Sequence, residues 1–418
     1  MENGQILQDI TFLIENYQND YYNMEDMKGL LYDAVNEILE MAVSHGFEGD
    51  LWHNYLTYLM ASHENAYSTS CEIVGPVDGS INQVALHDFE IFKELFDYDF
   101  ADLENVMGVD CISMLHDYVG TSGHGSVFNQ RIRDRICDLS KALAETETAV
   151  EFKDIMTQFY KEFGVGKLGL HKAFRIAHTE EGALIEPITK IAHVHLDDLV
   201  GYEIAKKKLI DNTKAFVEGK KANNCLLFGD AGTGKSSSIK AILNQYYDQG
   251  LRMIEVYKHQ FKDLNDVIAQ IKNRNYKFII YMDDLSFEEF EIEYKYLKAV
   301  IEGGLEKKPD NVLIYATSNR RHLIRETFKD KEDRDEELHT NDTVQEKLSL
   351  VARFGVTIYF GKPDKKQFQE IVRELAKKNG IDMSDDELFL EANKWELSHG
   401  GLSGRTAQQF IDYLAGTR

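Results

Sequence analysis

The sequence predicts an α/β fold in which five parallel strands carry helices on both faces. A helical lid follows this core, and a mostly α-helical N-terminal domain precedes it. Three observations support this. Residues 229–236 form a glycine-rich loop between an apolar strand and a helical pattern. From residue 224 onward, apolar strands alternate with helical segments, which is typical of a parallel sheet. Before residue 130, apolar residues recur mainly at helical spacing.

The composition indicates a folded protein without a membrane span. The chain has 418 residues, of which 43% are hydrophobic and four are prolines, so it can form two or three domains with cores of their own. No apolar run reaches the about 18 residues of a membrane span, and the first residues, Met-Glu-Asn-Gly, lack the basic and apolar regions of a signal peptide, so we expect a cytoplasmic location and no membrane contact. The cysteines lack metal-binding or disulfide spacing and are expected to be reduced; they are Cys71, Cys111, Cys137 and Cys225.

The net charge of −24 is concentrated at the N-terminus. Residues 1–130 contain 23 Asp and Glu but only two basic residues, Lys28 and Lys93, whereas residues 191–418 carry 38 acidic against 35 basic residues. Such an acidic surface repels nucleic acid, so nucleic-acid binding is not indicated. The acidity predicts either a docking surface for an unknown basic protein partner or a solubilising exterior.

Helical patterns and prolines suggest three domains. Helices are expected over residues 5–60, around 84–97 and over 129–163. Pro187 and Pro363 flank the alternating segment. The expected domains are therefore an acidic, mostly helical N-terminal accessory domain (1–185), an α/β core (186–363) and a helical lid (364–418).

The core is predicted to contain five strands with helices between them. Helical segments are expected around 264–272 and 293–301. The expected strands are about 224–229, 252–257, 277–283, 311–317 and 356–361.

The glycine-rich loop matches the phosphate-binding pattern G-x-x-x-x-G-K-[ST]. Its glycines let successive backbone N–H groups turn toward phosphate oxygens at a helix N-terminus. Lys235 would reach the β- and γ-phosphates of ATP, and the Ser236 hydroxyl would bind Mg²⁺. An incidental glycine-rich turn is the alternative, but the flanking strand and helix favour ATP or ADP with Mg²⁺. The nucleotide-binding residues would be Gly229, Asp230, Ala231, Gly232, Thr233, Gly234, Lys235, Ser236 and Ser237.

Two carboxylates end the apolar strand at 278–282. Asp283 would hold Mg²⁺, and Asp284 would orient or deprotonate the attacking water. An Asp pair can instead cap the next helix. The spacing of about 47 residues from the phosphate-binding loop favours the metal and catalytic roles.

With these two motifs in place, the chain resembles an AAA+ ATPase. The resemblance implies that the segment 196–202 contacts the adenine through Val200, Gly201 and Tyr202. It also implies roles for three single residues. Asn319, which ends the stretch 316–319, would be a sensor that polarises the water. Arg353 would be an arginine finger, and Arg405 in the lid would fold back over the phosphates.

A narrower resemblance covers residues from about 160 to 418. This part is similar to a bacterial family of AAA+-like ATPases classed as a domain of unknown function, and residues 1–150 lie outside the AAA+ resemblance. The resemblance implies an ATPase that couples nucleotide state to remodelling of an oligomer and a partner. The matching stretches are 283–288, 316–323, 346–350 and 353–355.

The sequence departs from the AAA+ pattern at two places. Asp284 stands where many members have Glu. Because Asp is one methylene shorter than Glu, we expect ATP hydrolysis to be slower. The segment 257–261, Tyr-Lys-His-Gln-Phe, lacks the aromatic-apolar-Gly pattern of members that thread polypeptides, although Tyr257 or Phe261 could still be exposed. Arg320 and Arg321 either reach a neighbouring subunit's nucleotide or serve locally, by solvating a helix start or pairing with the acidic stretch 330–337.

Three functions remain open from the sequence. We expect an ATPase whose activity depends on a homo-oligomer, a ring or an arc, with a hexamer as one form. A nucleotide switch without hydrolysis is the first alternative. A P-loop kinase that transfers the γ-phosphate to a small molecule is the second.

Overall fold

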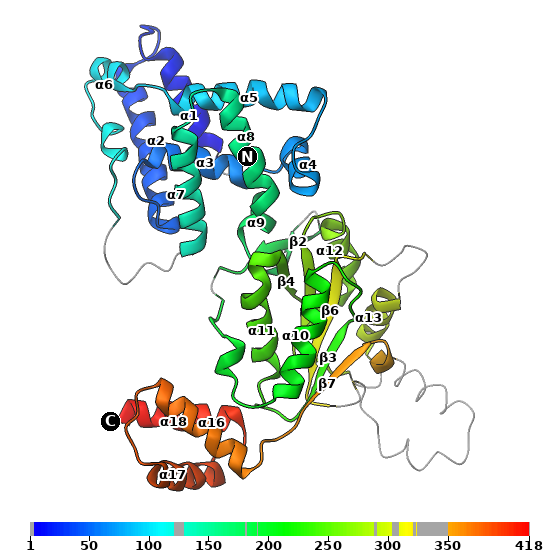
Figure 1. Cartoon of the computed structure of the whole chain (residues 1–418). Coiled ribbons are helices and arrows are strands. Elements are labelled where there is room, and N and C mark those ends of the chain that lie inside the picture. The colour runs from blue at the N-terminus through cyan, green and yellow to red at the C-terminus, as the bar shows by residue number, and fades with distance from the viewer. Residues whose placement is uncertain are drawn as a thin grey trace. The chain divides into compact units, whose positions relative to one another are not determined.

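The computed structural model describes residues 4–120, 129–179, 182–189, 191–287, 291–302, 309–320, 323 and 350–417. The chain divides into two compact units, Met1–His171 and Lys172–Arg418 (Figure 1).

The first unit is helical, as the periodicity predicted. A hydrophobic core runs through its described residues, with Trp52, Tyr55 and Phe152 among the largest buried side chains. Its helices are α1 (Gly4–Asn16), α2 (Met24–His45), α3 (Leu51–Ser62), α4 (Ala66–Val74), α5 (Ser80–Phe96), α6 (Ala101–Met107), α7 (Gln130–Ala144), α8 (Ala149–Phe163) and α9 (Gly166–Leu170).

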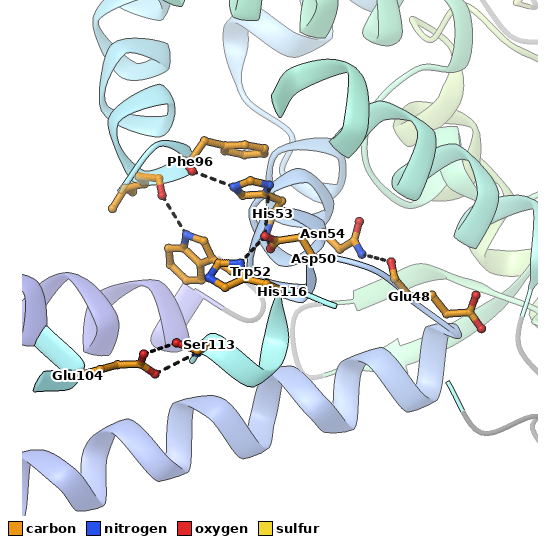
Figure 2. Close-up of polar contacts among 10 residues, drawn as sticks. Glu48, Asp50, Trp52, His53, Asn54, Phe96, Glu104, Ser113 and His116 are labelled. Carbon is orange, nitrogen blue, oxygen red and sulfur yellow. Dashed lines mark hydrogen bonds and ion pairs between the residues drawn. The ribbon is translucent and has the colours of Figure 1, made fainter. Parts of the chain in front are cut away.

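Polar contacts fix the start of α3 within this unit (Figure 2). Asp50 caps the helix, because its Oδ1 accepts a hydrogen bond of 2.8 Å from the His53 backbone N–H. Its Oδ2 lies 2.6 Å from Nδ1 of His116, in the loop after α6. The Trp52 indole N–H donates to the Leu95 carbonyl at 2.9 Å and so ties α3 to the end of α5. The helix start is therefore joined to two segments distant in sequence.

The second unit is built on a seven-stranded sheet with the order β2-β1-β4-β5-β6-β3-β7. The five predicted strands are present as β3 to β7, but the prediction of a five-stranded sheet was wrong. Two further strands extend the edge, β1 parallel to β4 and β2 antiparallel to β1. The strands are β1 (Ala173–Thr179), β2 (Gly182–Pro187), β3 (Cys225–Gly229), β4 (Leu251–Glu255), β5 (Lys277–Met282), β6 (Val312–Ser318) and β7 (Val356–Phe360).

The hairpin of β1 and β2 lies in the second unit, although the sequence analysis placed it in the N-terminal domain. Pairing with β4 covers an edge that would otherwise expose unpaired N–H and C=O groups. The alternation of buried Phe174 and Ile176 with more exposed neighbours was the available signal. The compact unit accordingly begins at Lys172 rather than at residue 186.

The strand order determines which face each helix covers. The chain moves from β3 outward to β4 through α11 (Lys235–Tyr246) and then returns through β5 to β6. Right-handed crossovers in opposite directions place their helices on opposite faces. The first face therefore carries α11 and also α10 (Glu203–Val217), and the other carries α12 (Leu264–Ile271) and α13 (Glu293–Glu302) (Figure 1).

Three helices form the lid: α16 (Lys365–Lys378), α17 (Asp385–Ser398) and α18 (Gly404–Thr417). They surround their own core, in which Phe368, Val372, Ala407 and Ile411 are buried. Among the helices of the described ranges, none has the length and apolar character needed to cross a membrane.

Candidate nucleotide-binding site

Three adjacent strands bring the predicted motifs together. In the order β5-β6-β3 all three strands run parallel, so their carboxyl ends lie at one edge of the sheet. Asp283 follows β5, Asn319 follows β6 and the glycine-rich loop follows β3. This edge is where ligands bind in open α/β sheets.

The glycine-rich loop takes a conformation that its glycines permit. Gly229, Gly232 and Gly234 have φ angles of 138°, 73° and 90°, which other residues rarely adopt. A Cβ atom on Gly229 would lie only 2.1 Å from the Phe360 carbonyl oxygen. The next residue, Asp230, donates its backbone N–H to that same oxygen at 3.0 Å. The loop is thus held tightly against the end of β7.

Lys235 opens α11 and is buried, with 6% of its surface exposed. Its ammonium donates to the carbonyl oxygens of Gly229 at 3.0 Å and Asp230 at 2.5 Å. It also donates to Oδ1 of Asn319 at 3.0 Å. Burial lowers the pKa of Lys235, although the nearby carboxylate of Asp284 acts in the opposite direction.

Asp283 accepts two hydroxyl hydrogen bonds at one oxygen. Ser236 donates to its Oδ1 at 2.7 Å and Thr317 donates to the same atom at 2.5 Å. Burial alone would raise the pKa of Asp283, but these hydrogen bonds outweigh it and hold the pKa below its usual value. Asp283 is therefore ionised at neutral pH.

The oxygen atoms at this place suit Mg²⁺. The cation commonly uses one or two protein oxygens and completes its shell with phosphates and water, and Ser236 with Asp283 fits that requirement. Among the described residues, no cluster of three or more His, Cys, Asp or Glu is arranged to hold a metal by itself. All four cysteines are free thiols.

Asp284 is held in a strained conformation beside Asp283. Its φ of 49° is positive, which for a non-glycine residue costs of the order of 1 kcal/mol. Its backbone N–H donates to Oγ1 of Thr317 at 2.8 Å, and the side-chain amide of Asn319 donates to its Oδ1 at 2.7 Å. Thr317 thus donates to the carboxylate of Asp283 and accepts from the backbone of Asp284. The sequence analysis missed it, although it lies in the stretch 316–319 quoted there.

These groups line a pocket of about 640 Å³ between the sheet edge and the lid. The pocket includes Val200, Tyr202, residues 231–237, Asp283, Asp284, Asn319 and Arg405 among the predicted site residues. Gly201, Gly229, Asp230 and Arg353 do not line it. The lining residues that were not predicted are Asp198, Leu199, Lys206, Ser238, Thr317, Phe360, Ile371, Leu375, Gly404, Gln408 and Gln409.

The segment 196–202, which was expected to contact the adenine, supplies part of the pocket lining. The Tyr202 hydroxyl donates to the Gly361 carbonyl at 3.0 Å, and burial raises the pKa of Tyr202 to about 12. The Lys206 ammonium donates to the Leu199 carbonyl at 2.8 Å. Lys378 of α16 lies 2.7 Å from Oδ1 of Asp198, and this ion pair joins the segment to the lid.

The lid meets the phosphate-binding loop directly. The backbone N–H of Arg405, in the first turn of α18, donates to the Gly232 carbonyl at 3.2 Å. A Cβ atom on Gly232 would lie 3.0 to 3.3 Å from atoms of Ser403 and Arg405. The small size of Gly232 therefore permits this close approach.

The other predicted arginines lie elsewhere. Arg353 forms an ion pair with Glu302 of α13. The backbone N–H of Arg320 donates to the Ser318 hydroxyl at 3.1 Å. Arg321, the acidic stretch 330–337 and residues 346–349 lie outside the described residues. In the segment after β4, Tyr257 is 50% exposed, whereas Phe261 is buried.

Comparison with known protein families identifies one that matches this chain. The sequence model of the family described as "Protein of unknown function (DUF815)" matches residues 169–418. None of the curated proteins matches this sequence.

Two solved structures are among those that match part of the chain. The RuvB Holliday junction branch migration motor of Thermotoga maritima is 16% identical over 52% of this chain and 63% of its own, with a TM-score of 0.36. The match thus spans less than two thirds of the RuvB chain. The FIGL-1 AAA domain in complex with ADP is 16% identical over 55% of this chain and 74% of its own, with a TM-score of 0.38.

Proposed function

The chain belongs to the DUF815 family, and from this premise we propose that it binds ATP with Mg²⁺ and hydrolyses it as an AAA+ type ATPase. One observation carries the proposal: Asn319 bridges Lys235 and Asp284 at the sheet edge. The same pocket wall holds the Ser236–Asp283 pair. Few functions other than nucleotide chemistry need a buried lysine, two carboxylates and a glycine-rich helix start together.

The phosphates would bind at the N-terminus of α11. Its N-cap, Gly234, has no side chain to cap the first N–H groups, which leaves them for phosphate oxygens. The Lys235 ammonium would exchange the loop carbonyls for the β- and γ-phosphates. Leu199, Ile371 and Leu375 supply an apolar wall for the base.

Hydrolysis would transfer the γ-phosphoryl group to water, giving ADP and phosphate. Mg²⁺ at Ser236 and Asp283 would neutralise charge on the phosphates. Asp284 would accept the proton of the attacking water, and Asn319 would orient both that water and the carboxylate. Arg405, placed at the lid side of the pocket, would contact the phosphates and report their state to the lid.

Arg353 supports an oligomeric ATPase. It does not line the pocket of its own chain, so a role as arginine finger requires a neighbouring subunit. We therefore propose a ring or an arc, of which a hexamer is one form, in which Arg353 of one subunit completes the next subunit's site.

The N-terminal unit is proposed to dock a basic polypeptide. Its two lysines before residue 130 are already paired, Lys28 with Glu25 at 3.4 Å and Lys93 with Asp97 at 2.5 Å. A mostly apolar cavity of about 510 Å³ lies between α1, α3, α4, α5 and α8, with Val84 and Asp88 in its lining. An amphipathic helix with Lys or Arg on its polar face would complement both features.

The decisive experiment separates the three functions left open by the sequence. ATP turnover is measured with purified protein and no added phosphate acceptor. Turnover that disappears in Lys235→Ala supports the ATPase. Binding of ATP without turnover supports the switch, and turnover that begins only when a small-molecule acceptor is added supports a kinase. Absence of nucleotide binding by the native chain would refute the proposal.

A further inference from the structure

Tyr281 is buried close to the proposed metal site. It stands on β5, and Asp283 follows two residues later, just after the strand ends. Its side chain is 2% exposed and belongs to the core formed with α11, which also contains Ile239. Ser236, the other proposed metal ligand, lies in the first turn of that helix.

The hydroxyl of Tyr281 is buried and makes no hydrogen bond of ordinary geometry with a described residue. It nevertheless lies beside the Ser236–Asp283 pair. Burial raises the pKa of Tyr281, and the charge of the nearby Asp283 raises it further. A buried hydroxyl without a partner is costly, so its position calls for an explanation.

A neighbouring tyrosine shows that this core can satisfy such a group. Tyr315 of β6 is paired in register with Tyr281 and belongs to the same core. Its hydroxyl lies 2.9 Å from Nδ2 of Asn212 and 2.9 Å from Oγ1 of Thr213, both in α10. The two tyrosines share burial and sheet face but differ in hydrogen bonding, and only Tyr281 lies at the metal site.

We propose that Tyr281 is a positioning residue for Mg²⁺, whose hydroxyl donates a hydrogen bond to the Asp283 carboxylate when the cation is bound. This inference rests on the proposed function. Carboxylates that bind metals are commonly oriented by further hydrogen-bond donors, whose loss lowers metal affinity by about 10- to 100-fold. Ser236 and Thr317 already donate to Oδ1 of Asp283. Tyr281 would add a third donor to this carboxylate.

The test compares Tyr281→Phe with Tyr315→Phe in the full-length protein. Each variant loses one buried hydroxyl and keeps its ring. Binding of a fluorescent ADP analogue is titrated with Mg²⁺ and repeated in EDTA. For Tyr281→Phe we expect the half-saturating Mg²⁺ concentration to rise about tenfold, with affinity in EDTA unchanged. Tyr315→Phe should keep the native Mg²⁺ dependence.

Thermal unfolding of the ligand-free proteins separates metal positioning from damage to the core. Tyr281→Phe should match or exceed the native unfolding temperature, because it removes an unbonded hydroxyl, whereas Tyr315→Phe should unfold at a lower temperature. A native Mg²⁺ dependence in Tyr281→Phe would overturn the inference while leaving nucleotide binding intact. An equal rise of the half-saturating Mg²⁺ concentration in Tyr281→Phe and Tyr315→Phe would also overturn the inference. If the native protein binds no analogue at any Mg²⁺ concentration, the proposed function itself fails.

Discussion

The side-chain amide of Asn319 donates a hydrogen bond of 2.7 Å to the carboxylate of Asp284, across the ends of β6 and β5. The oxygen of the same amide accepts a hydrogen bond of 3.0 Å from Lys235. One side chain therefore connects the phosphate-binding lysine with the proposed base. Because the amide is fixed at both ends, its orientation is determined by the two charged groups.

Replacing Asp284 by Asn tests the catalytic role of this carboxylate. The amide keeps the size of the side chain but cannot accept a proton, so phosphate release should fall about 10²- to 10⁴-fold. ATP affinity should change only a few-fold. Asp211→Asn, at an exposed position on α10, is the control for removal of one negative charge. Equal turnover in the native protein and Asp284→Asn would exclude Asp284 as the base.

Mixing two inactive variants tests whether Arg353 acts on a neighbouring subunit. Arg353→Ala should lower turnover about 10³- to 10⁵-fold, and Lys235→Ala should also be inactive. Mixed oligomers should regain activity, because the intact loop of one variant meets the intact arginine of the other.

The ion pair with Glu302 provides the matched control for Arg353. Glu302→Gln removes the same pair and keeps the arginine, so it should retain most of the activity. If Glu302→Gln is as inactive as Arg353→Ala, or if mixing restores nothing, Arg353 acts within its own chain.

The lowered pKa of Lys235 predicts opposite pH effects on binding and stability. As the pH rises through this pKa, below the usual 10.5 of lysine, the ammonium loses its proton and ATP affinity should fall. Over the same range the unfolded chain holds that proton more tightly than the folded chain, so the contribution of Lys235 to the free energy of unfolding should rise.

The comparison is made with Lys235→Arg for binding and Lys235→Met for stability. Arginine stays charged, so affinity in Lys235→Arg should lack the decline at alkaline pH. The difference in unfolding free energy between the native protein and Lys235→Met should shift in favour of the native protein as pH rises. If the ATP affinity of Lys235→Arg also declines at alkaline pH, the decline is caused by a group other than Lys235.

Gly229→Ala tests the close contact between the loop and β7. The added Cβ would meet the Phe360 oxygen at 2.1 Å, at a φ of 138°. We expect a loss of about 3 kcal/mol or more in the free energy of unfolding, measured with urea. Gly250→Ala has a φ of 90° but no atom within 4 Å of the new Cβ, so conformational strain alone should cost about 1–2 kcal/mol. Equal losses would mean that the contact with Phe360 is relieved by a small shift.

A charge placed in the cavity of the N-terminal unit tests the proposed docking site. A synthetic helical peptide of Leu and Lys serves as the probe, and its binding should weaken as salt is added. Val84→Lys adds a positive charge to the cavity lining, which repels the lysines of the probe, and should weaken binding at least tenfold. Val119→Lys adds the same charge at a residue that is 83% exposed and outside the lining, and it should bind normally. Equal binding by both variants would indicate attraction to the acidic surface alone.

Local sequence patterns determined much of the secondary structure and the chemical groups of the site. The glycine-rich loop, the apolar strand before Asp283 and the helical periodicity before residue 130 each depend on neighbours in sequence. These signals were enough to predict strands β3 to β7 and the helical lid, and they pointed to Lys235, Ser236, Asp283 and Asp284, which the structure places in one pocket. The hairpin of β1 and β2 was missed because short strands give weak periodicity. The hairpin is held in the sheet by pairing of β1 with the edge of β4, which lies far along the chain.

Tertiary structure decided how these parts are connected. The sequence by itself supplied the chemical groups, because residue type and spacing determine what a loop or strand end can bind. It could not show that Thr317 forms hydrogen bonds with both Asp283 and Asp284, or that Arg353 pairs with Glu302. Nor could it distinguish Tyr281 from Tyr315, two buried tyrosines on adjacent strands. Hydrogen bonding between side chains depends on which strands become neighbours, and the order β5-β6-β3 is set by the packing of the whole sheet.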